Sequence, residues 1–209
     1  MDSPDPDFDR ALRARYPRLA GVDEVGRGPW AGPVTACAVI LEPGRVPQGL
    51  RDSKTLSHAR REALAAQILA VGQVAVVHVD VDEIDRTNIL AASMTAMARA
   101  LARLEPAPDL ALIDGNRVPE DLPFAARAVV RGDATSEVVA AASIVAKVTR
   151  DRLMVALSQQ FPGYGWHSNA GYGTAAHRAG LEKHGVTPHH RRSFKPVHNI
   201  LCAPKMPKS

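Results

Sequence analysis

The chain has 209 residues and a formal net charge of +4, with 45% hydrophobic and 23% charged residues, a composition that fits one globular domain, or one domain with an appendage. Aromatic residues make up only 4%, so the core must be aliphatic and rich in alanine. No apolar run reaches the roughly 18 residues of a membrane span, and the acidic, proline-rich start lacks the features of a signal peptide, so we expect no membrane association and a cytoplasmic location. The two cysteines, Cys37 and Cys202, lie far apart and suggest neither a disulfide framework nor a zinc site.

Basic residues gather in the C-terminal third of the chain. They occur over residues 189–195 and again at Lys205 and Lys208. The sequence pI is about 9.3. Such a basic side could face a polyanion, or it could be a solvated tail, and charge alone leaves both interpretations open.

The first half of the chain predicts a pair of strands followed by alternating helices and strands. After a mobile lead-in over residues 1–17, with a short helical piece around residues 10–16, the expected elements are strands over 19–25 and 34–41, a loop over 42–49, a helix over 58–71, a strand over 73–81 and helical structure over 82–104 in one or two pieces. Ser57 is placed to cap the helix over 58–71. Pro106 and Pro108 end the helical stretch before them.

The second half predicts further strands and one long helix. The expected elements are strands over 109–114 and 126–130, a helix over 135–160, a loop rich in glycine and aromatic residues over 161–173, a helix over 174–184 and a basic segment from residue 188. Together these elements indicate an α/β protein with a mixed sheet and helices on its faces.

Three predicted strands end in or lead into carboxylates, namely Asp23 with Glu24, Asp114, and Asp133. Sites in α/β sheets gather at strand ends, so these side chains are expected to converge. Clustered carboxylates repel one another unless cations neutralise them, and hard oxygen ligands suit Mg²⁺ or Mn²⁺. Two such ions bridged by a carboxylate form the clamp used for in-line phosphodiester hydrolysis.

Each of these carboxylates also has a structural interpretation. Asp114 suits a turn, because Gly115 follows it, and Asp133 could cap the next helix. Asp23 and Glu24 could form a polar strand edge. Neighbours on a regular strand face opposite ways, so both reach one site only if the strand ends or bulges there, which Gly26 permits.

The helix over residues 135–160 has a polar stripe opposite its apolar face. The stripe consists of Ser136, Ser143, Lys147 and Arg150. An ordinary amphipathic helix explains most of it, with a pair between Lys147 and Asp151 one turn apart.

The loop over residues 163–173 combines flexible backbone with the aromatic side chains of Tyr164, Trp166 and Tyr172. These rings could stack on nucleotides, or they could pack a surface loop. Arg27, between two glycines, could reach a phosphate.

Seven stretches of the sequence resemble ribonuclease HII, the bacterial type 2 ribonuclease H, in family order over residues 18–196. They are GVDEVGRGPWAGPV (21–34), DSK (52–54), IDGN (113–116), GD (132–133), AASIVAKVTRD (141–151), NAGYGT (169–174) and HRRSF (190–194). The resemblance implies a ribonuclease H-like α/β fold with a small helical C-terminal extension. It divides the chain into a catalytic domain over residues 18–160 and a substrate-binding helical segment with a basic tail over residues 161–209.

The resemblance implies an endonuclease that hydrolyses the RNA strand of RNA–DNA hybrids. It also implies incision 5′ of single ribonucleotides embedded in duplex DNA, with 5′-phosphate and 3′-hydroxyl ends, for ribonucleotide excision repair and RNA primer removal. The family suggests a monomer, and the sequence identifies no protein partner.

The resemblance further assigns roles to single residues. The catalytic and metal-binding residues would be Asp23, Glu24, Asp114 and Asp133, which would hold two Mg²⁺ or Mn²⁺ ions when substrate is bound. Residues that would read the 2′-hydroxyl are Gly26, Arg27 and Gly28, while Tyr172 would stack on the sugar of the next deoxynucleotide. Candidates for phosphate contacts are Lys54, Lys147, Arg191 and Arg192.

Three positions depart from the family pattern. Thr55 and Ala170 stand where lysine is common, and Ala176 stands where glutamate is common. These changes put the strength of duplex binding in doubt and leave the chemistry untouched.

Two other functions would share part of this sequence pattern. A nuclease or strand-transfer enzyme of the ribonuclease H-like class that cuts DNA would share the carboxylates but would not need the Gly26–Gly28 turn with Tyr172. The related ribonuclease HIII would need an N-terminal domain, for which about twenty residues leave no room. A non-catalytic nucleic-acid-binding module would not tolerate four carboxylates facing phosphates without a metal.

Overall fold

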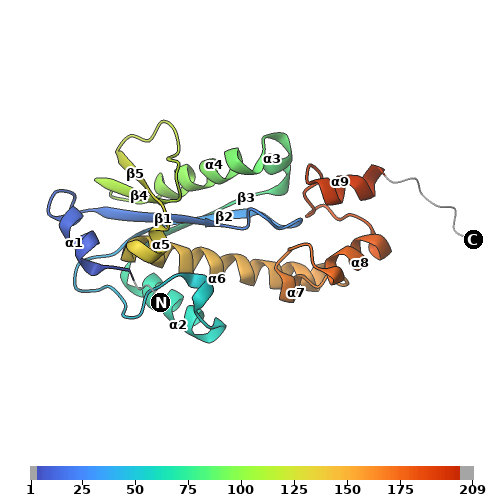
Figure 1. Ribbon diagram of the computed structural model, residues 1–209, viewed down its shortest axis with the longest axis horizontal. Coiled ribbons are helices and arrows are strands. Elements are labelled where there is room, and N and C mark those ends of the chain that lie inside the picture. Colours follow the sequence, from blue (N-terminus) through green and yellow to red (C-terminus); the bar gives the residue numbers. More distant parts are fainter. Residues whose placement is uncertain (1–3, 203–209) are drawn as a thin grey trace, which may run out of the picture.

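The computed structural model describes residues 4–202, and the predicted contributions of Lys205 and Lys208 to the basic tail lie outside that range. A five-stranded sheet with the strand order β3-β2-β1-β4-β5 forms the centre of the molecule (Figure 1). The strands are β1 (Leu19–Val25), β2 (Val34–Ile40), β3 (Gln73–Val79), β4 (Leu110–Asp114) and β5 (Ala125–Val129). The helices are α1 (Pro6–Arg13), the 3-10 turn η1 (Ser53–Thr55), α2 (His58–Val71), α3 (Val81–Arg86), α4 (Ile89–Leu101), α5 (Gly132–Thr135), α6 (Glu137–Gln160), α7 (Trp166–Asn169), α8 (Ala175–His184) and α9 (Lys195–Cys202).

The sheet is mixed, as predicted. β1 pairs antiparallel with β2 and parallel with β4, β3 adds antiparallel to β2, and β5 adds parallel to β4. Helix α4 covers one face, while α6 covers the other and packs against α2 (Figure 1). Each face has its own buried aliphatic cluster, and a third cluster lies under α7, α8 and α9 at one end of the molecule.

Helix α6 lies unusually close to the central strand β1. A Cβ added to Gly21 of β1 would lie 2.1 Å from the carbonyl carbon of Val138 at the start of α6, so only glycine fits there. The small side chains of Ala140, Ala141 and Ala142 follow on α6 and are fully buried. This close approach fixes β1, and therefore its C-terminal end, against a rigid helix.

Most expected elements are confirmed, and Ser57 caps α2 by accepting a hydrogen bond from the backbone N–H of Arg60. The helical stretch over residues 82–104 is two helices, α3 and α4. The predicted helix over 135–160 begins instead at Glu137, because the Ser136 side chain caps α6 and a separate short helix, α5, precedes it.

Residues near both ends of the described range form helices that the sequence did not predict in full. Helix α1 begins at Pro6, earlier than predicted, because Asp5 caps it and proline suits the first helical position. Asp9 of α1 is buried and accepts a hydrogen bond from the N–H of Val138, so this part of the expected lead-in packs on α6. The basic C-terminal segment contains α9, whose Val197 is buried in the third cluster.

No helix within residues 4–202 is long and apolar enough to cross a membrane.

Candidate active site

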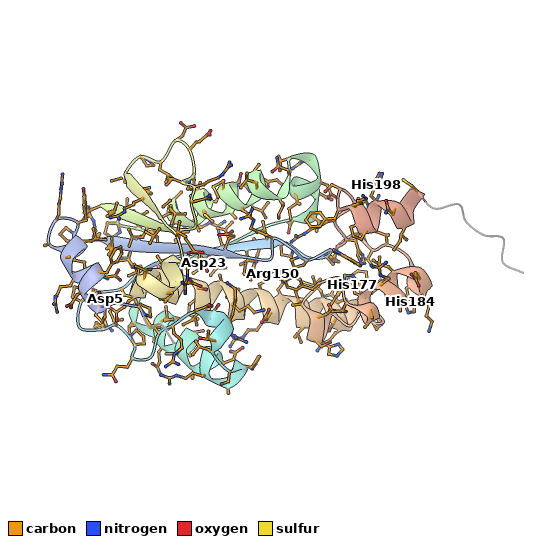
Figure 2. All side chains as sticks on the ribbon, in the orientation of Figure 1. Asp5, Asp23, Arg150, His177, His184 and His198 are labelled. Atoms are coloured by element: carbon orange, nitrogen blue, oxygen red, sulfur yellow. The ribbon has the colours of Figure 1, made fainter. Side chains whose placement is uncertain are left out.

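The four predicted carboxylates lie at one end of the sheet, where β4 ends beside the last residues of β1 that pair with it and α5 begins. Parallel pairing of these strands runs up to Val22 opposite Ile113, so the next residue of each strand is a carboxylate, Asp23 or Asp114. Asp114 accepts a hydrogen bond at 2.7 Å from the N–H of Gly132, which draws the start of α5 to the end of β4. Asp133 follows on α5 and is 8% exposed. Figure 2 shows Asp23 near the middle of the molecule, between the sheet and α6.

Asp23 and Glu24 both reach this end of the sheet without any irregularity in β1. The antiparallel register with β2 is continuous from Ala20 opposite Ile40 to Val25 opposite Thr35, so the bulge considered from the sequence is absent. On its other side β1 pairs with β4 only up to Val22, because Asp114, the last residue of β4, pairs with Val129 of β5 instead. We infer that the free edge lets the two side chains approach Asp114 from opposite faces, since the charge of Asp114 raises the pKa of both.

Burial and mutual repulsion disfavour ionised carboxylates at this site. Burial raises the pKa of Asp23 well above its usual value, and the charges of Asp114 and Glu24 raise it further. Burial likewise raises the pKa of Glu24, although Arg27 opposes this effect with a guanidinium 3.3 Å from the glutamate. The pKa of Asp133 is raised by burial, then by Asp114. A bound cation would relieve this repulsion.

Lys54 on the turn η1 is a second positive partner of this carboxylate group, besides Arg27. Burial lowers its pKa, but the charges of nearby aspartates outweigh that effect and raise it. Those aspartates are Asp52, Asp133, Asp23 and Asp114. Lys54 therefore faces the carboxylates, next to the end of the sheet where a phosphate contact was predicted.

The carboxylates fit Mg²⁺ or Mn²⁺ by their chemistry rather than as a preformed cage. Among residues 4–202, no three His, Cys, Asp or Glu side chains are arranged to hold a metal ion. Mg²⁺ commonly binds through one or two carboxylates, with water and substrate phosphates completing its shell. The oxygen-only donor set and the raised carboxyl pKa values suit that mode of binding.

Ser143 is a neighbour of Asp23 that the sequence did not identify as part of the site. It donates a hydrogen bond that lowers the pKa of Asp23, against the stronger effect of burial. Its hydroxyl also lies 3.0 Å from that of Ser53 on η1, and both side chains are buried. Ser143 belongs to the expected polar stripe of α6, so the stripe is not simply a solvated face.

The turn of Gly26, Arg27 and Gly28 lies directly after β1 and against Tyr172. A Cβ on Gly28 would lie 3.4 Å from the Tyr172 ring, and the tyrosine is 46% exposed. Gly26 has a φ of +93°, and a Cβ there would lie 2.2 Å from Nε of Arg150, so no other residue fits. The structure thus brings the Gly26–Gly28 turn and Tyr172, the two parts of the predicted sugar-recognition site, next to each other.

Two fully buried arginines hold this turn and the residues after it. Arg191 donates to the carbonyls of Gly26, Arg27 and Gly32 at 2.5, 2.8 and 3.0 Å. Arg191 is 0% exposed, so the phosphate contact predicted for it is wrong: its guanidinium is committed to backbone carbonyls.

Arg150 of α6 holds the segment that follows the turn and the loop before Tyr172. It donates to the carbonyls of Pro33, Ala170 and Ala31. Burial lowers the pKa of Arg150 to about 10. The polar stripe in the sequence predicted on which face of the helix Arg150 lies, but it did not predict that loop carbonyls would surround the guanidinium.

The other predicted phosphate contacts have different surroundings. Lys147 forms the expected pair with Asp151 at 2.8 Å and is partly buried. Arg192 has an exposed side chain, while its backbone N–H is held by Asp85. Of the predicted aromatic stack, Tyr164 and Trp166 are buried core residues, and only Tyr172 is exposed.

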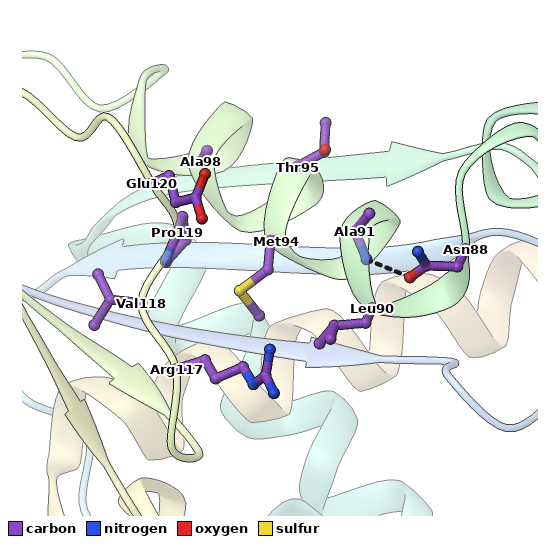
Figure 3. A pocket seen from close by; sticks show the side chains of 10 residues that line it. All are labelled: Asn88, Leu90, Ala91, Met94, Thr95, Ala98, Arg117, Val118, Pro119 and Glu120. Atoms are coloured by element: carbon purple, nitrogen blue, oxygen red, sulfur yellow. Dashed lines mark hydrogen bonds between the residues drawn. The ribbon is translucent and has the colours of Figure 1, made fainter.

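A separate hollow of about 640 Å³ lies between α4 and the loop after β4 (Figure 3). Met94 and Leu90 form its apolar part, and Arg117 projects toward them. None of the four carboxylates lines it, so it is distinct from the candidate site.

Comparison with known proteins gives one consistent result. A family model described as "Ribonuclease HII" matches residues 20–197. A curated ribonuclease HII from Cereibacter sphaeroides is 67% identical over 183 residues, covering 88% of this chain and 86% of that protein. Another from Ruegeria is 60% identical over 202 residues, covering 96% and 88%. The crystal structure of ribonuclease H2 from Pyrococcus horikoshii superposes with a TM-score of 0.76 at 28% identity, covering 88% of this chain and 96% of that one.

Proposed function

The chain belongs to the ribonuclease HII family and is therefore a ribonuclease H endonuclease, and on that premise we propose that it cuts RNA–DNA hybrids and also nicks duplex DNA 5′ of a single embedded ribonucleotide. The observation that carries the proposal is the close approach of Tyr172 to Gly28, in the turn that directly follows the strand of Asp23 and Glu24. A nuclease that ignored the sugar would have no use for such a turn at its active site.

Four carboxylates are proposed to bind two divalent cations, Mg²⁺ or Mn²⁺. They are Asp23, Glu24, Asp114 and Asp133. The chemistry expected of two such ions is activation of water and stabilisation of the departing 3′-oxygen, giving 5′-phosphate and 3′-hydroxyl ends. The side chains themselves would hold the ions, and the backbone N–H of Gly132 would keep Asp114 oriented by its hydrogen bond.

The sugar is proposed to be recognised by the turn and the tyrosine together. The carbonyls of Gly26 and Arg27 accept hydrogen bonds from Arg191, which fixes the peptide planes of the turn. Fixed backbone groups can approach a sugar closely where side chains are absent, and the 2′-hydroxyl distinguishes RNA from DNA. Tyr172, half exposed beside Gly28, would stack on the sugar of the following deoxynucleotide.

Phosphate contacts are proposed for three basic residues around the site. Lys54 faces the carboxylates and would meet the scissile strand, while Lys147 and Arg192 would contact phosphates farther away. Roles in ribonucleotide excision repair and primer removal, a cytoplasmic location and a monomeric state remain predictions.

The deciding experiment compares three duplexes with the same sequence: one with a single ribonucleotide, one RNA–DNA hybrid and one of DNA alone. With Mg²⁺, and again with Mn²⁺, we expect a nick 5′ of the single ribonucleotide, cleavage of the hybrid and no cutting of DNA alone. Equal cutting of the all-DNA duplex would instead indicate a DNA nuclease.

Asp114→Asn tests the carboxylates. It should reduce cleavage by roughly 1,000-fold, because the metal clamp supplies several kcal/mol. The asparagine side-chain oxygen can still accept from Gly132, so the fold should persist. Asp109→Asn is the matched control, since Asp109 precedes the same strand at its opposite end and is paired with Arg18. Comparable activity of the two variants would refute the assignment.

A further inference from the structure

A buried polar network lies within the aromatic cluster beneath the C-terminal helices. It consists of Trp166, His177 and His190, each at most 1% exposed, with Thr187 at its end. Figure 2 shows His177 at the end of the molecule where the C-terminal helices lie. Two histidines that share a hydrogen bond in an apolar core cost desolvation free energy, so they need a compensating role in structure or in function.

The hydrogen bonds of this network allow only one arrangement of protons. The backbone N–H of Thr187 donates to Nδ1 of His190 at 3.0 Å, so the proton of the neutral His190 ring is on Nε2. That Nε2–H points at Nε2 of His177, 3.0 Å away. Trp166, which can only donate, points its Nε1–H at the same His177 atom from 3.1 Å, so the two N–H groups share the single lone pair of that nitrogen.

His177 therefore accepts at Nε2 and carries its own proton on Nδ1. The Nδ1 atom lies 3.0 Å from the backbone carbonyl oxygen of Tyr172, to which it donates. Burial lowers the pKa of both histidines, which agrees with neutral rings. The chain of donors from Thr187 through His190 and His177 thus ends on the backbone of the proposed sugar-stacking residue.

The same network is connected to the residues that follow the Gly26–Gly28 turn, the other part of the proposed sugar-recognition site. His190 forms an isolated antiparallel bridge with Ala31, and the N–H of Arg191 donates to the carbonyl of Trp30. On the tyrosine side, the N–H of Trp30 donates to the carbonyl of Gly171. The residues that follow the Gly26–Gly28 turn and the residues around Tyr172 are thereby held against each other.

We propose that His177 is a positioning residue for ribonucleotide recognition, which fixes the Tyr172 backbone through its Nδ1–H, and that His190 sets the His177 tautomer that makes this donation possible. The inference rests on the proposed function, because it assigns Tyr172 to the sugar. Neither histidine touches the substrate.

Two substitutions at one position separate the donor from the acceptor of His177. In His177→Asn the side-chain amide lies near the former Nδ1 and can still donate to Tyr172, but the acceptor for Trp166 and His190 is lost. In His177→Gln the amide lies near the former Nε2, so the acceptor is kept and the donor to Tyr172 is lost. Each variant loses one half of the network.

The measured quantity is the discrimination ratio, defined as Kd for an all-DNA duplex divided by Kd for the same duplex with one ribonucleotide. Binding is measured with Ca²⁺ in place of Mg²⁺, and a gel checks that the duplexes stay intact. We expect His177→Gln to reduce the ratio about fivefold or more and His177→Asn to leave it within about twofold of wild type. Melting temperatures of both variants show whether any loss merely follows stability.

Each outcome bears on a different statement. An unchanged ratio in folded His177→Gln, or an equal loss in both variants, overturns the inference while the proposed function stands. A wild-type ratio of about one overturns the proposed function, and the inference with it. If a variant does not fold, nitrogen-15 NMR of the wild-type imidazoles decides: we expect Nδ1–H for His177 and Nε2–H for His190, and the opposite tautomers would refute the proposal.

Discussion

Lowering the pH should destabilise the protein through His190, and replacing this residue with glutamine should remove the effect. Burial is the main reason that the pKa of His190 falls from 6.5 to about 3, and the neighbouring His177 lowers it further. The unfolded chain therefore takes up a proton on His190 near pH 6.5, whereas the folded protein resists protonation down to about pH 3. Within this window the unfolded state binds more protons, so the free energy of unfolding falls as the pH decreases.

The size of the effect follows from the two pKa values. At about pH 5 this one proton lowers the free energy of unfolding by about 2 kcal/mol, and at about pH 7.5 the loss is close to zero. The side chain is 1% exposed, so solvent screens the effect little. A loss of this size is a large share of the roughly 5–15 kcal/mol by which domains are stable.

Urea unfolding of the wild type and of His190→Gln, followed by far-ultraviolet circular dichroism, measures this contribution. Carboxylates and the histidines that do not contact His190 titrate in both proteins and largely cancel in the difference. Between about pH 7.5 and 5 we expect the difference in free energy of unfolding to shift by about 2 kcal/mol in favour of the variant. A difference constant to within about 0.5 kcal/mol over that range would refute the reasoning, because His190 would then titrate alike in both states.

Three further predictions concern the central strand, the carboxylates and the brace of the turn. Gly21→Ala should lower the free energy of unfolding in urea by about 3 kcal/mol or more, since its Cβ would lie 2.1 Å from the carbonyl carbon of Val138. Gly28→Ala, whose Cβ would meet one side chain at 3.4 Å, should lower it little. Equal losses of stability in the two variants would contradict the close packing of β1 on α6. Mg²⁺ or Mn²⁺ should raise the melting temperature by relieving repulsion at Asp23, and chelation should reverse the gain; no shift would argue against the metal site. Arg191→Lys should lower the discrimination ratio, because an ammonium group cannot reproduce the planar guanidinium that donates to three carbonyls. An unchanged ratio would show that Arg191 has no role in sugar recognition.

The carboxylate site could be predicted from the sequence because strand ends are local features. Asp23 and Asp114 each follow an apolar run, and parallel pairing of β1 with β4 then places them side by side. How Asp23 and Glu24 share a site could not be predicted, because the answer depends on where the pairing of β1 with β4 stops. The length of a partner strand is a tertiary property and leaves no mark on the sequence of β1.

The roles of the buried arginines could not be predicted for a related reason. Sequence pattern favours exposed arginines, and burial becomes favourable only when the fold supplies carbonyls that lack other donors. Arg150 finds them in two separate loops, and Arg191 finds them in the turn after β1. The start of helix α1, by contrast, is marked in the sequence by Asp5, which caps the helix, and by Pro6 at its first position. These two residues indicate where the helix begins better than the hydrophobic pattern does.

The hydrogen bond from Arg191 to the carbonyl of Arg27 joins residues 164 positions apart in the chain. During synthesis from the N-terminus, all four carboxylates emerge well before Arg191, so the catalytic end of the sheet can assemble while the turn is still unbraced. Closing so long a loop costs more chain entropy than local pairing, so we expect the bracing of the turn by Arg191 to form after the pairing of β1 with β2. A nascent or truncated chain that ends before Arg191 would carry the four proposed catalytic carboxylates but not the guanidinium that fixes the turn, so we expect it to discriminate poorly between ribonucleotides and deoxynucleotides.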